Sequence, residues 1–353
     1  SSDVCSSDLI AVASVGILAA CGKDAAKDQT VVRVGTMAKS ESEQARWDKI
    51  EEILKKEGIT LKFSEFTDYS QPNVALNNGD IDINAFQHYN FLDNWNSDHK
   101  TDLVPIAETY FTAFRVYSGT EGGKNKYKDI KELPEGATIA IPNDAVNESR
   151  ALNLLQSAGL IKLSVGANDK AKLTDVSENS KNLNIREVDA AQTAANIDSV
   201  DAAIINNDFV TEAGIDPKTA IYVEPASKNT KQWYNLLVAQ KGWEKSDKAD
   251  AIKKVIKAYH TDEVKGIIKK SSQGLDEPVW KERTLWKELF LPEGASGAWC
   301  NLLRSKKVFY LFALVILEDM YQTQLTRRYV VKRRGTPRQW RLSLIQKLFL
   351  LLI

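Results

Sequence analysis

The fold follows from residues 31–86, which read in order VVRVGTM (31–37), ESEQARWDKIEEILKKEG (41–58), TLKFSEF (60–66), QPNVALNN (71–78) and IDINAF (81–86). The first, third and fifth segments are rich in β-branched or alternating residues and predict strands. The second carries apolar residues at helical spacing and ends in a glycine, which predicts a helix. Strands that alternate with helices in this way predict a parallel sheet.

A second set of strands and helices follows the first. Its expected strands are TIAIPN (138–143), IREVD (185–189) and AAIINN (202–207), and its expected helices are 145–158, one that begins near Ala190 and one that runs through Ala213. The chain then returns through IYVEP (221–225) and NLLVA (235–239) and closes with helices 247–259 and 261–271.

This out-and-back path predicts an α/β protein with two lobes and a cleft between them. We expect lobe 1 to contain residues 31–113 and 224–280, and lobe 2 to contain residues 114–223. Ligands of such sheets bind beyond the carboxyl ends of the strands. In lobe 1 these ends are near 35–39, 65–69 and 85–89.

The charge of the chain is distributed unevenly. The 353 residues have a net charge of zero, but residues 281–353 hold 14 Lys and Arg against 5 Asp and Glu, whereas residues 1–280 hold 33 against 42. The acidic body offers no basic groove, so nucleic-acid binding is not expected. The shift in charge indicates that the tail differs from the body in origin or environment.

The N-terminal region resembles an export signal. Residues 9–20 (LIAVASVGILAA) form an apolar run that is too short to cross a bilayer and suits a signal peptide, so we expect 1–21 to be its remnant. Leu18-Ala19-Ala20-Cys21 resembles a lipobox, which predicts acylation of Cys21 and a lipid anchor, with 22–30 as a linker. The alternative is a buried cysteine after an apolar helix. We interpret residues 1–8 as adapter-derived sequence that replaces the true start.

Aromatic residues gather at two predicted strand ends. Tyr69 follows the strand 60–66, and Phe86, His88 and Tyr89 end or follow the strand 81–86. Such side chains can wall a slot for an apolar group, and a thioether is a favourable guest because sulfur packs well on aromatic rings. Ordinary core packing under the next helix is the alternative interpretation.

Polar residues also cluster near predicted strand ends and at the start of a predicted helix. Asn147 and Arg150 share one face of the first turns of the helix after 138–143, where free N–H groups and a guanidinium could bind a carboxylate. A surface arginine paired with Glu148 is the alternative. Asn206 and Asn235 lie at strand ends, and their amides could hold amino and carboxylate groups together, although asparagines are also common in turns.

Signals for an enzyme are weak. The three histidines are scattered, there is no GxSxG, HExxH, Walker or GxGxxG motif, and no cysteine lies between Cys21 and Cys300. We therefore expect no catalytic residues, no cofactor, no metal site and no disulfide in the body of the chain.

These groups of residues, in this order, resemble the MetQ/NlpA family of methionine-binding lipoproteins. The resemblance covers residues 31–280 and is carried by VRVG (32–35), NNGDIDINAFQHYNFL (77–92), IAIPNDAVNESRALNLLQSAGLIKL (139–163), AIINNDF (203–209) and YNLLV (234–238). It implies a two-lobed periplasmic-binding-protein (type II) fold that closes on its ligand, with an ABC permease and ATPase as partners.

By this resemblance, Arg150 would hold the ligand's α-carboxylate, and Asn147, Asn206 and Asn235 would complete a polar cage. Four aromatic residues would line the side-chain slot, namely Tyr69, Phe86, His88 and Tyr89. The implied protein is a monomeric lipoprotein on the extracytoplasmic face of the cell membrane that captures L-methionine for an importer.

Two questions stay open at this level. The ligand could instead be D-methionine, a methionine-containing dipeptide or another amino acid, and the chain could be a surface lipoprotein or adhesin without a transport role. The tail 281–353 departs from the family, and we interpret it as a non-native extension from a lost stop codon or a frameshift; a membrane-surface extension is the alternative.

Overall fold

The computed structural model describes residues 30–166, 169–227 and 230–280. The first of two five-stranded sheets has the strand order β2-β1-β3-β15-β4. Its strands are β1 (Thr30–Met37), β2 (Ile59–Phe66), β3 (Ile83–Asn84), β4 (Val104–Glu108) and β15 (Leu236–Ala239). β1 pairs in parallel with β2 and β3, whereas β15 pairs antiparallel with β3 and β4. The three predicted parallel strands are therefore present, and a returning strand extends them.

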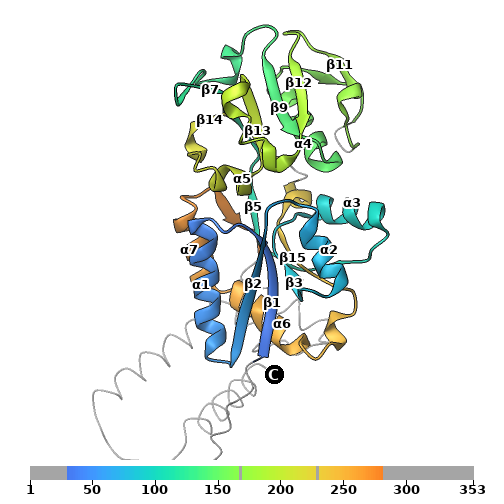
Figure 1. The fold of residues 1–353 in the computed structure, drawn as a ribbon, viewed down its shortest axis with the longest axis vertical. Helices are drawn as coiled ribbons and strands as arrows, with labels where there is room; N and C mark the ends of the chain where they lie inside the picture. The colour runs from blue at the N-terminus through green and yellow to red at the C-terminus, as the bar shows by residue number, and fades with distance from the viewer. Residues whose placement is uncertain (1–29, 167–168, 228–229, 281–353) are drawn as a thin grey trace, which may run out of the picture. The chain divides into compact units, whose positions relative to one another are not determined.

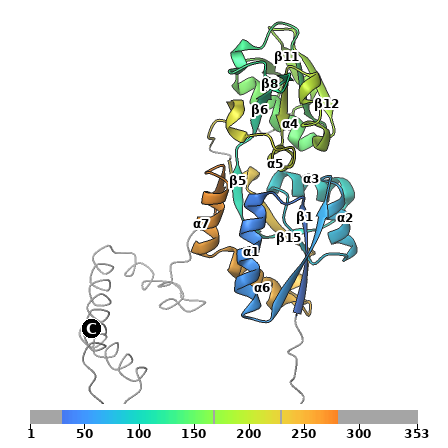
Figure 2. The ribbon, with the colours of Figure 1, turned by 60° about the vertical axis from the view of Figure 1, so that its left-hand side comes forward.

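Helices cover both faces of this sheet, and together with it they form lobe 1. Figures 1 and 2 show α1, α6 and α7 on one face and α2 and α3 on the other. Their bounds are α1 (Glu41–Lys55), α2 (Gln71–Asn78), α3 (Tyr89–His99), α6 (Ala249–Tyr259) and α7 (Asp262–Ser271). Ser40 and Glu43 form a capping box that fixes the start of α1, because each side chain satisfies a free backbone N–H of the other.

The second sheet has the order β12-β9-β13-β6-β14 and is the centre of lobe 2. Its strands are β6 (Arg115–Ser118), β9 (Thr138–Pro142), β12 (Asn184–Val188), β13 (Ala202–Ile205) and β14 (Ala220–Val223). β9 pairs in parallel with β12 and β13, and β6 pairs antiparallel with β13 and β14. The helices are α4 (Ala145–Ser157), which follows β9, and α5 (Asn207–Glu212), which follows β13.

Short elements complete the described chain. The paired strands are β5 (Tyr110–Thr112) with β16 (Asp276–Pro278), β7 (Thr120–Glu121) with β8 (Lys124–Asn125), and β10 (Lys162–Leu163) with β11 (Val176–Glu178). Single 3₁₀ turns occur at Ile130–Glu132, Leu173–Asp175, Ala190–Gln192, Ile197–Ser199, Pro217–Thr219, Thr230–Trp233 and Trp243–Lys245.

The chain passes between the sheets twice, between β5 and β6 and between β14 and β15. The two passages are hydrogen-bonded to each other. The Glu224 N–H donates to the Phe114 carbonyl at 2.8 Å, and the Phe114 N–H donates to Glu224 Oε2 at 2.9 Å. The crossings predicted at 110–118 and 221–225 thus lie side by side.

Each lobe has its own apolar core, and a third cluster contains residues of both. The core of lobe 1 includes Val34, Trp47 and Leu237, and the core of lobe 2 includes Ile139 and Leu152. The third cluster includes Met37 and Phe86 from lobe 1 with Tyr117, Ile205 and Phe209 from lobe 2. Since burial of apolar area favours association, this cluster holds the carboxyl ends of the two sheets together.

One predicted element is wrong. The helix expected from Ala190 is only a 3₁₀ turn over Ala190–Gln192. The Thr193 hydroxyl donates to the Ala190 carbonyl at 2.7 Å, and Asn196 Nδ2 donates to the Gln192 carbonyl at 2.8 Å. Such side-chain bonds compete with the helical backbone pattern, so the segment folds as successive turns.

No helix within residues 30–166, 169–227 and 230–280 combines the length and apolar character needed to span a membrane. The predicted signal peptide, the lipobox cysteine Cys21 and the linker before Thr30 lie outside the described residues, as does the basic tail 281–353. The described chain ends at Trp280, which is buried and stacks on His260 at 5.0 Å between ring centroids.

Candidate ligand-binding site

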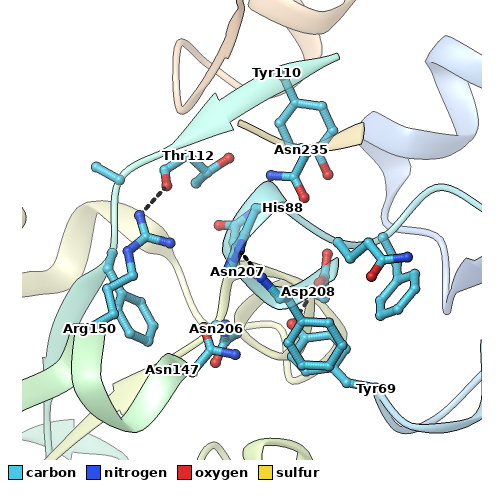
Figure 3. Close-up of a pocket in the computed structure, with 15 residues that line it drawn as sticks. Tyr69, His88, Tyr110, Thr112, Asn147, Arg150, Asn206, Asn207, Asp208 and Asn235 are labelled. Carbon is cyan, nitrogen blue, oxygen red and sulfur yellow. Dashed lines mark hydrogen bonds between the residues drawn. The ribbon is translucent and has the colours of Figure 1, made fainter. Parts of the chain in front are cut away.

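A pocket with a cavity volume of about 50 Å³ lies at the carboxyl ends of the parallel strands, between side chains of the two lobes (Figure 3). It is large enough for more than one water molecule and is lined by both polar and aromatic groups. The lining residues are Tyr69, Phe86, Gln87, His88, Phe91, Tyr110, Thr112, Ala113, Phe114, Asn147, Arg150, Asn206, Asn207, Asp208 and Asn235.

The sheet topology explains why residues far apart in the sequence meet here. Tyr69, Phe86 and His88 follow β2 and β3, and Asn206 follows β13. Asn235 precedes β15, which runs antiparallel to β3, so its amino end lies at the same edge as the carboxyl end of β3. Seven of the eight predicted ligand-binding residues therefore line one pocket, and Tyr89 does not.

Arg150 is the buried cation of the site, with 6% of its surface exposed. Its Nε and Nη2 donate to the two carboxylate oxygens of Glu224 at 3.0 and 2.5 Å, and Nη2 also donates to the Thr112 carbonyl at 3.2 Å. The guanidinium lies 4.4 Å from the ring centroid of Trp233. Within the described residues, Nη1 makes no hydrogen bond, so it can donate to a ligand.

A chain of amide contacts connects α4 with the end of β13. Asp144, the N-cap of α4, accepts from the Asn147 backbone N–H at 3.0 Å and from Asn147 Nδ2 at 2.9 Å. Asn147 Oδ1 in turn accepts from Asn206 Nδ2 at 3.1 Å. Because a carboxylate only accepts, this chain fixes which end of each amide faces which neighbour.

Two amide oxygens in the pocket are buried without a partner among the described residues, Asn206 Oδ1 and Asn207 Oδ1. A buried acceptor that lacks a donor costs about 1–3 kcal/mol, so such atoms are uncommon and are expected where a ligand supplies the missing donor.

Asp208 lies beside these amides and contacts Tyr69 of lobe 1. The Tyr69 hydroxyl donates to Asp208 Oδ2 at 2.7 Å. Burial, with the nearby carboxylate of Glu43, raises the pKa of Asp208 to about 7, although the Tyr69 hydrogen bond opposes the rise. Burial and the charge of Asp208 likewise raise the pKa of Tyr69 well above its usual value.

Aromatic rings occupy the lobe 1 side of the pocket. The ring of Tyr69 lies 5.8 Å from Phe86, 5.9 Å from Phe91 and 5.0 Å from Phe209, between centroids. Phe86 and Phe91 meet edge to face at 5.8 Å. Separations of this size are typical of favourable aromatic pairs, so the rings form a wall that holds its shape.

His88 is a neutral member of this wall. Its Nδ1 accepts from the Phe91 backbone N–H at 3.2 Å as the N-cap of α3, so the proton of the neutral ring is on Nε2. Burial, and next the charge of Arg150, lower the pKa of His88 to about 3 against an opposing interaction with Asn147. His88 can therefore donate one hydrogen bond but does not bring a positive charge at neutral pH.

The structure places Tyr89 away from the pocket. Tyr89 is the first residue of α3, and its hydroxyl donates to Glu108 Oε1 at 3.0 Å while Lys231 lies 5.7 Å from its ring centroid. Its side chain packs with the cluster of Leu76 and Leu92. Tyr89 is therefore not among the side chains that line this pocket, because consecutive residues at a helix start direct their side chains apart.

Several lining or supporting residues were not predicted. Glu224 and Trp233 flank Arg150, and Asp208 and Phe91 line the pocket. Asp208, Phe91 and Trp233 had a sequence signal, since each lies within three residues of a predicted site residue, whereas Glu224 had none. Within the described residues, no cluster of His, Cys, Asp and Glu has the arrangement of a metal site.

Residues 32–280 match the family model described as NlpA lipoprotein. The D-methionine-binding lipoprotein MetQ of Escherichia coli (strain K12) is 36% identical over 251 residues, which are 70% of this chain and 87% of that protein.

Solved structures are similar over the same region. The substrate binding protein of a methionine transporter from Streptococcus pneumoniae is 58% identical, with a TM-score of 0.70 over 71% of this chain and 96% of its own. A nutrient binding protein from Burkholderia cenocepacia, whose structure is bound to methionine, is 38% identical with a TM-score of 0.63 over 70% and 100%. These likenesses confirm the predicted two-lobed α/β binding-protein fold.

Proposed function

Because the chain belongs to the NlpA lipoprotein family, we propose that it captures L-methionine in the pocket between its lobes and delivers it to an ABC importer. The observation that carries this proposal is the pocket itself. It combines a buried guanidinium, amide groups and a carboxylate with a wall of aromatic rings. A zwitterionic amino acid with an apolar, sulfur-containing side chain complements both parts.

The polar part suits the α-carboxylate of the ligand. Arg150 offers Nη1, and Asn147, Asn206 and Asn235 surround the same space with amides that both donate and accept. Glu224 and Trp233 hold the guanidinium in place, so little rotamer freedom remains to be lost when the ligand binds.

The aromatic part suits the thioether. Phe86, Phe91 and the ring of Tyr69 surround the slot, and His88 closes it toward Trp233 at 5.0 Å between centroids. Contact between sulfur and an aromatic ring contributes about 0.3–1.5 kcal/mol beyond the burial of the methylene groups. A neutral His88 adds no charge that an apolar side chain would have to desolvate.

We propose that the two sheets are the centres of lobes with the predicted bounds, 31–113 with 224–280 and 114–223. The passages near Phe114 and Glu224 would then act as the hinge. Arg150 contacts both passages, through the Thr112 carbonyl and the Glu224 carboxylate, so a ligand held by Arg150 would be coupled directly to the hinge.

We propose further that the protein is a monomer anchored through acylated Cys21 on the extracytoplasmic face of the cell membrane, with a permease and an ATPase as partners. The names of the family and of the E. coli relative support a lipoprotein. In this proposal the protein binds its ligand and catalyses no reaction. Metabolic labelling with a fatty-acid analogue tests the anchor, because Cys21→Ala should abolish labelling.

Isothermal titration calorimetry of the full chain tests the ligand. L-methionine, D-methionine, a glycyl-methionine dipeptide and L-leucine should be compared at pH 8. We expect L-methionine to bind most tightly. Absence of heat with L-methionine, together with clear binding of another of these solutes, would contradict the proposal and identify the ligand class instead.

A further inference from the structure

A buried ion pair lies in lobe 1, outside the ligand pocket. Arg46 of α1 and Asp276 of β16 are 1% and 3% exposed, and Arg46 Nη2 donates to Asp276 Oδ2 at 2.6 Å. The guanidinium also lies 4.4 Å from the ring centroid of Tyr110 on β5. Neither charged side chain is among those that line the pocket. A buried ion pair often contributes little net stability, because both ions lose their hydration. This pair is therefore better explained by the geometry that it fixes.

Asp276 connects the ion pair to the strand that leads out of lobe 1. β16 pairs antiparallel with β5, and Asp276 lies opposite Thr112, the last residue of β5. The Thr112 hydroxyl donates to Asp276 Oδ1 at 2.6 Å, and the Asp276 N–H donates to the Ser272 hydroxyl oxygen at 3.1 Å. One carboxylate oxygen thus faces α1 and the other faces β5. The side chain of Asp276 therefore fixes the end of β5 against the body of lobe 1.

Thr112 contacts both this carboxylate and the arginine of the ligand pocket. Its carbonyl accepts from Arg150 Nη2 at 3.2 Å, the bond drawn as a dashed line between the two residues in Figure 3. Nη2 also donates to Glu224 Oε2 at 2.5 Å, so both of its hydrogens are used. The next strand, β6, begins at Arg115 in lobe 2. Thr112 is therefore held by lobe 1 through its hydroxyl and by a side chain of lobe 2 through its carbonyl.

We infer that Arg46, Asp276 and Thr112 form a relay that positions Arg150 relative to the aromatic wall of lobe 1. In this relay Arg46 orients Asp276, Asp276 orients Thr112, and the Thr112 carbonyl holds the guanidinium. Residues that hold a binding side chain in place contribute to affinity, because a displacement of about 1 Å weakens the contacts of that side chain. The strand β16 is thus needed for tight binding, although Asp276 lies outside the pocket. The inference rests on the proposed binding of the ligand carboxylate by Arg150.

Calorimetry with conservative variants of the full chain tests the relay, at a temperature well below their melting temperatures. Thr112→Val keeps the shape of the side chain and the carbonyl but removes the hydroxyl, and we expect the affinity for L-methionine to fall about tenfold. Thr112→Ser keeps a hydroxyl and should stay within about threefold of the wild type. Asp276→Asn removes the charge that holds Arg46 and should also lose about tenfold.

A double variant separates positioning from direct contact between Thr112 and the ligand. Thr112→Val combined with Asp276→Asn should bind L-methionine about as weakly as either single variant, because both changes break the same path. If Thr112 contacted the ligand independently of Asp276, the two losses would multiply to about 100-fold. Phe91→Ala combined with Asp276→Asn is the additive reference, since Phe91 lines the pocket and takes no part in the relay.

Thr193→Val is the matched control for the loss of a buried hydroxyl. Thr193 is fully buried in lobe 2, donates to the Ala190 carbonyl at 2.7 Å and is not among the residues that line the pocket. Its substitution should lower the melting temperature, as Thr112→Val does, but leave the affinity for L-methionine within about twofold of the wild type. A purely structural role of Thr112 would make the two variants behave alike.

The outcomes are distinct. Wild-type affinity in both Thr112→Val and Asp276→Asn, or multiplied losses in the double variant, would overturn the relay and leave methionine capture intact. Failure of the wild-type chain to bind L-methionine would instead remove the proposed function. If Asp276→Asn does not fold, the threonine variants decide. Equal affinities of Thr112→Val and Thr193→Val would then overturn the relay, and a loss confined to Thr112→Val that Thr112→Ser restores would support it.

Discussion

The two lobes contribute different chemistry to the same pocket. Lobe 1 supplies mainly rings, among them Phe86, Phe91 and His88. Lobe 2 supplies mainly hydrogen-bonding and charged groups, namely Asn147, Arg150, Asn206, Asn207 and Asp208. The difference follows from the ends of the sheets, because β2 and β3 of lobe 1 run into aromatic loops, whereas β9 and β13 of lobe 2 run into helices that begin with asparagine and aspartate.

This division suggests how selectivity and closure are connected. A zwitterionic head group would bind lobe 2, and its side chain would then have to meet the rings of lobe 1. Only a ligand with both parts would satisfy both lobes. Tyr69 on Asp208 and Asn235 beside His88 are among the exceptions, since they bring polar atoms of lobe 1 to the polar side.

The largest effect is expected from Arg150→Ala in lobe 2. Loss of the guanidinium removes the charge partner of the ligand carboxylate, and we expect the affinity for L-methionine to fall about 100-fold or more, as measured by calorimetry. The substitution also leaves the Glu224 carboxylate without its bidentate partner. The double variant Arg150→Ala with Glu224→Gln should recover thermal stability but not binding.

Arg186→Ala is the control for this comparison, because Arg186 is exposed on β12 of the same lobe. Its affinity for L-methionine should equal that of the wild type. An unchanged affinity in Arg150→Ala would show that lobe 2 does not provide the carboxylate site.

A smaller effect is expected from Phe91→Ala in lobe 1. The substitution removes apolar area from the slot without touching the charged groups, so L-methionine should bind about tenfold more weakly. Phe63→Ala removes a ring that packs on Trp47 in the same lobe, away from the pocket, and should leave the affinity unchanged. Equal losses in both variants would mean that Phe91 acts through the stability of lobe 1 and not through ligand contact.

A third prediction concerns the pH dependence of stability that the buried carboxyl group of Glu148 gives lobe 2. The pKa of Glu148 is about 7 in the folded protein, above that of an unfolded glutamate, so the folded state binds more protons and loses stability as pH rises from about 4.5 to 7. Glu148→Gln should be more stable than the wild type at pH 8 by on the order of 1 kcal/mol, with no difference at pH 4. The prediction would be wrong if urea titrations gave the same difference in free energy of unfolding between the wild type and Glu148→Gln at every pH from 4 to 8.

The smallest effect is expected at Tyr89. Because its hydroxyl contacts Glu108 and its ring lies outside the pocket, Tyr89→Phe should change the methionine affinity by less than a factor of two. A clear loss of affinity would instead place Tyr89 in the ligand slot.

The strand ends and seven of the fifteen residues that line the pocket could be predicted from the sequence, because parallel strands place their carboxyl ends at one edge whatever lies between them. The family match confirms the resemblance found in the motifs. Glu224 could not be assigned, since its pairing with Arg150 spans 74 residues and depends on how the two passages meet. The direction of Tyr89 and the turns after Ala190 depended on side-chain hydrogen bonds that spacing does not reveal.

The most direct test of the division between the lobes is a crystal structure of the chain with L-methionine. It should place the carboxylate on Arg150 Nη1 and the thioether against the rings of Phe86 and Phe91. A ligand bound with its side chain toward Arg150 and its charged groups against the rings, or bound outside this pocket, would contradict the account.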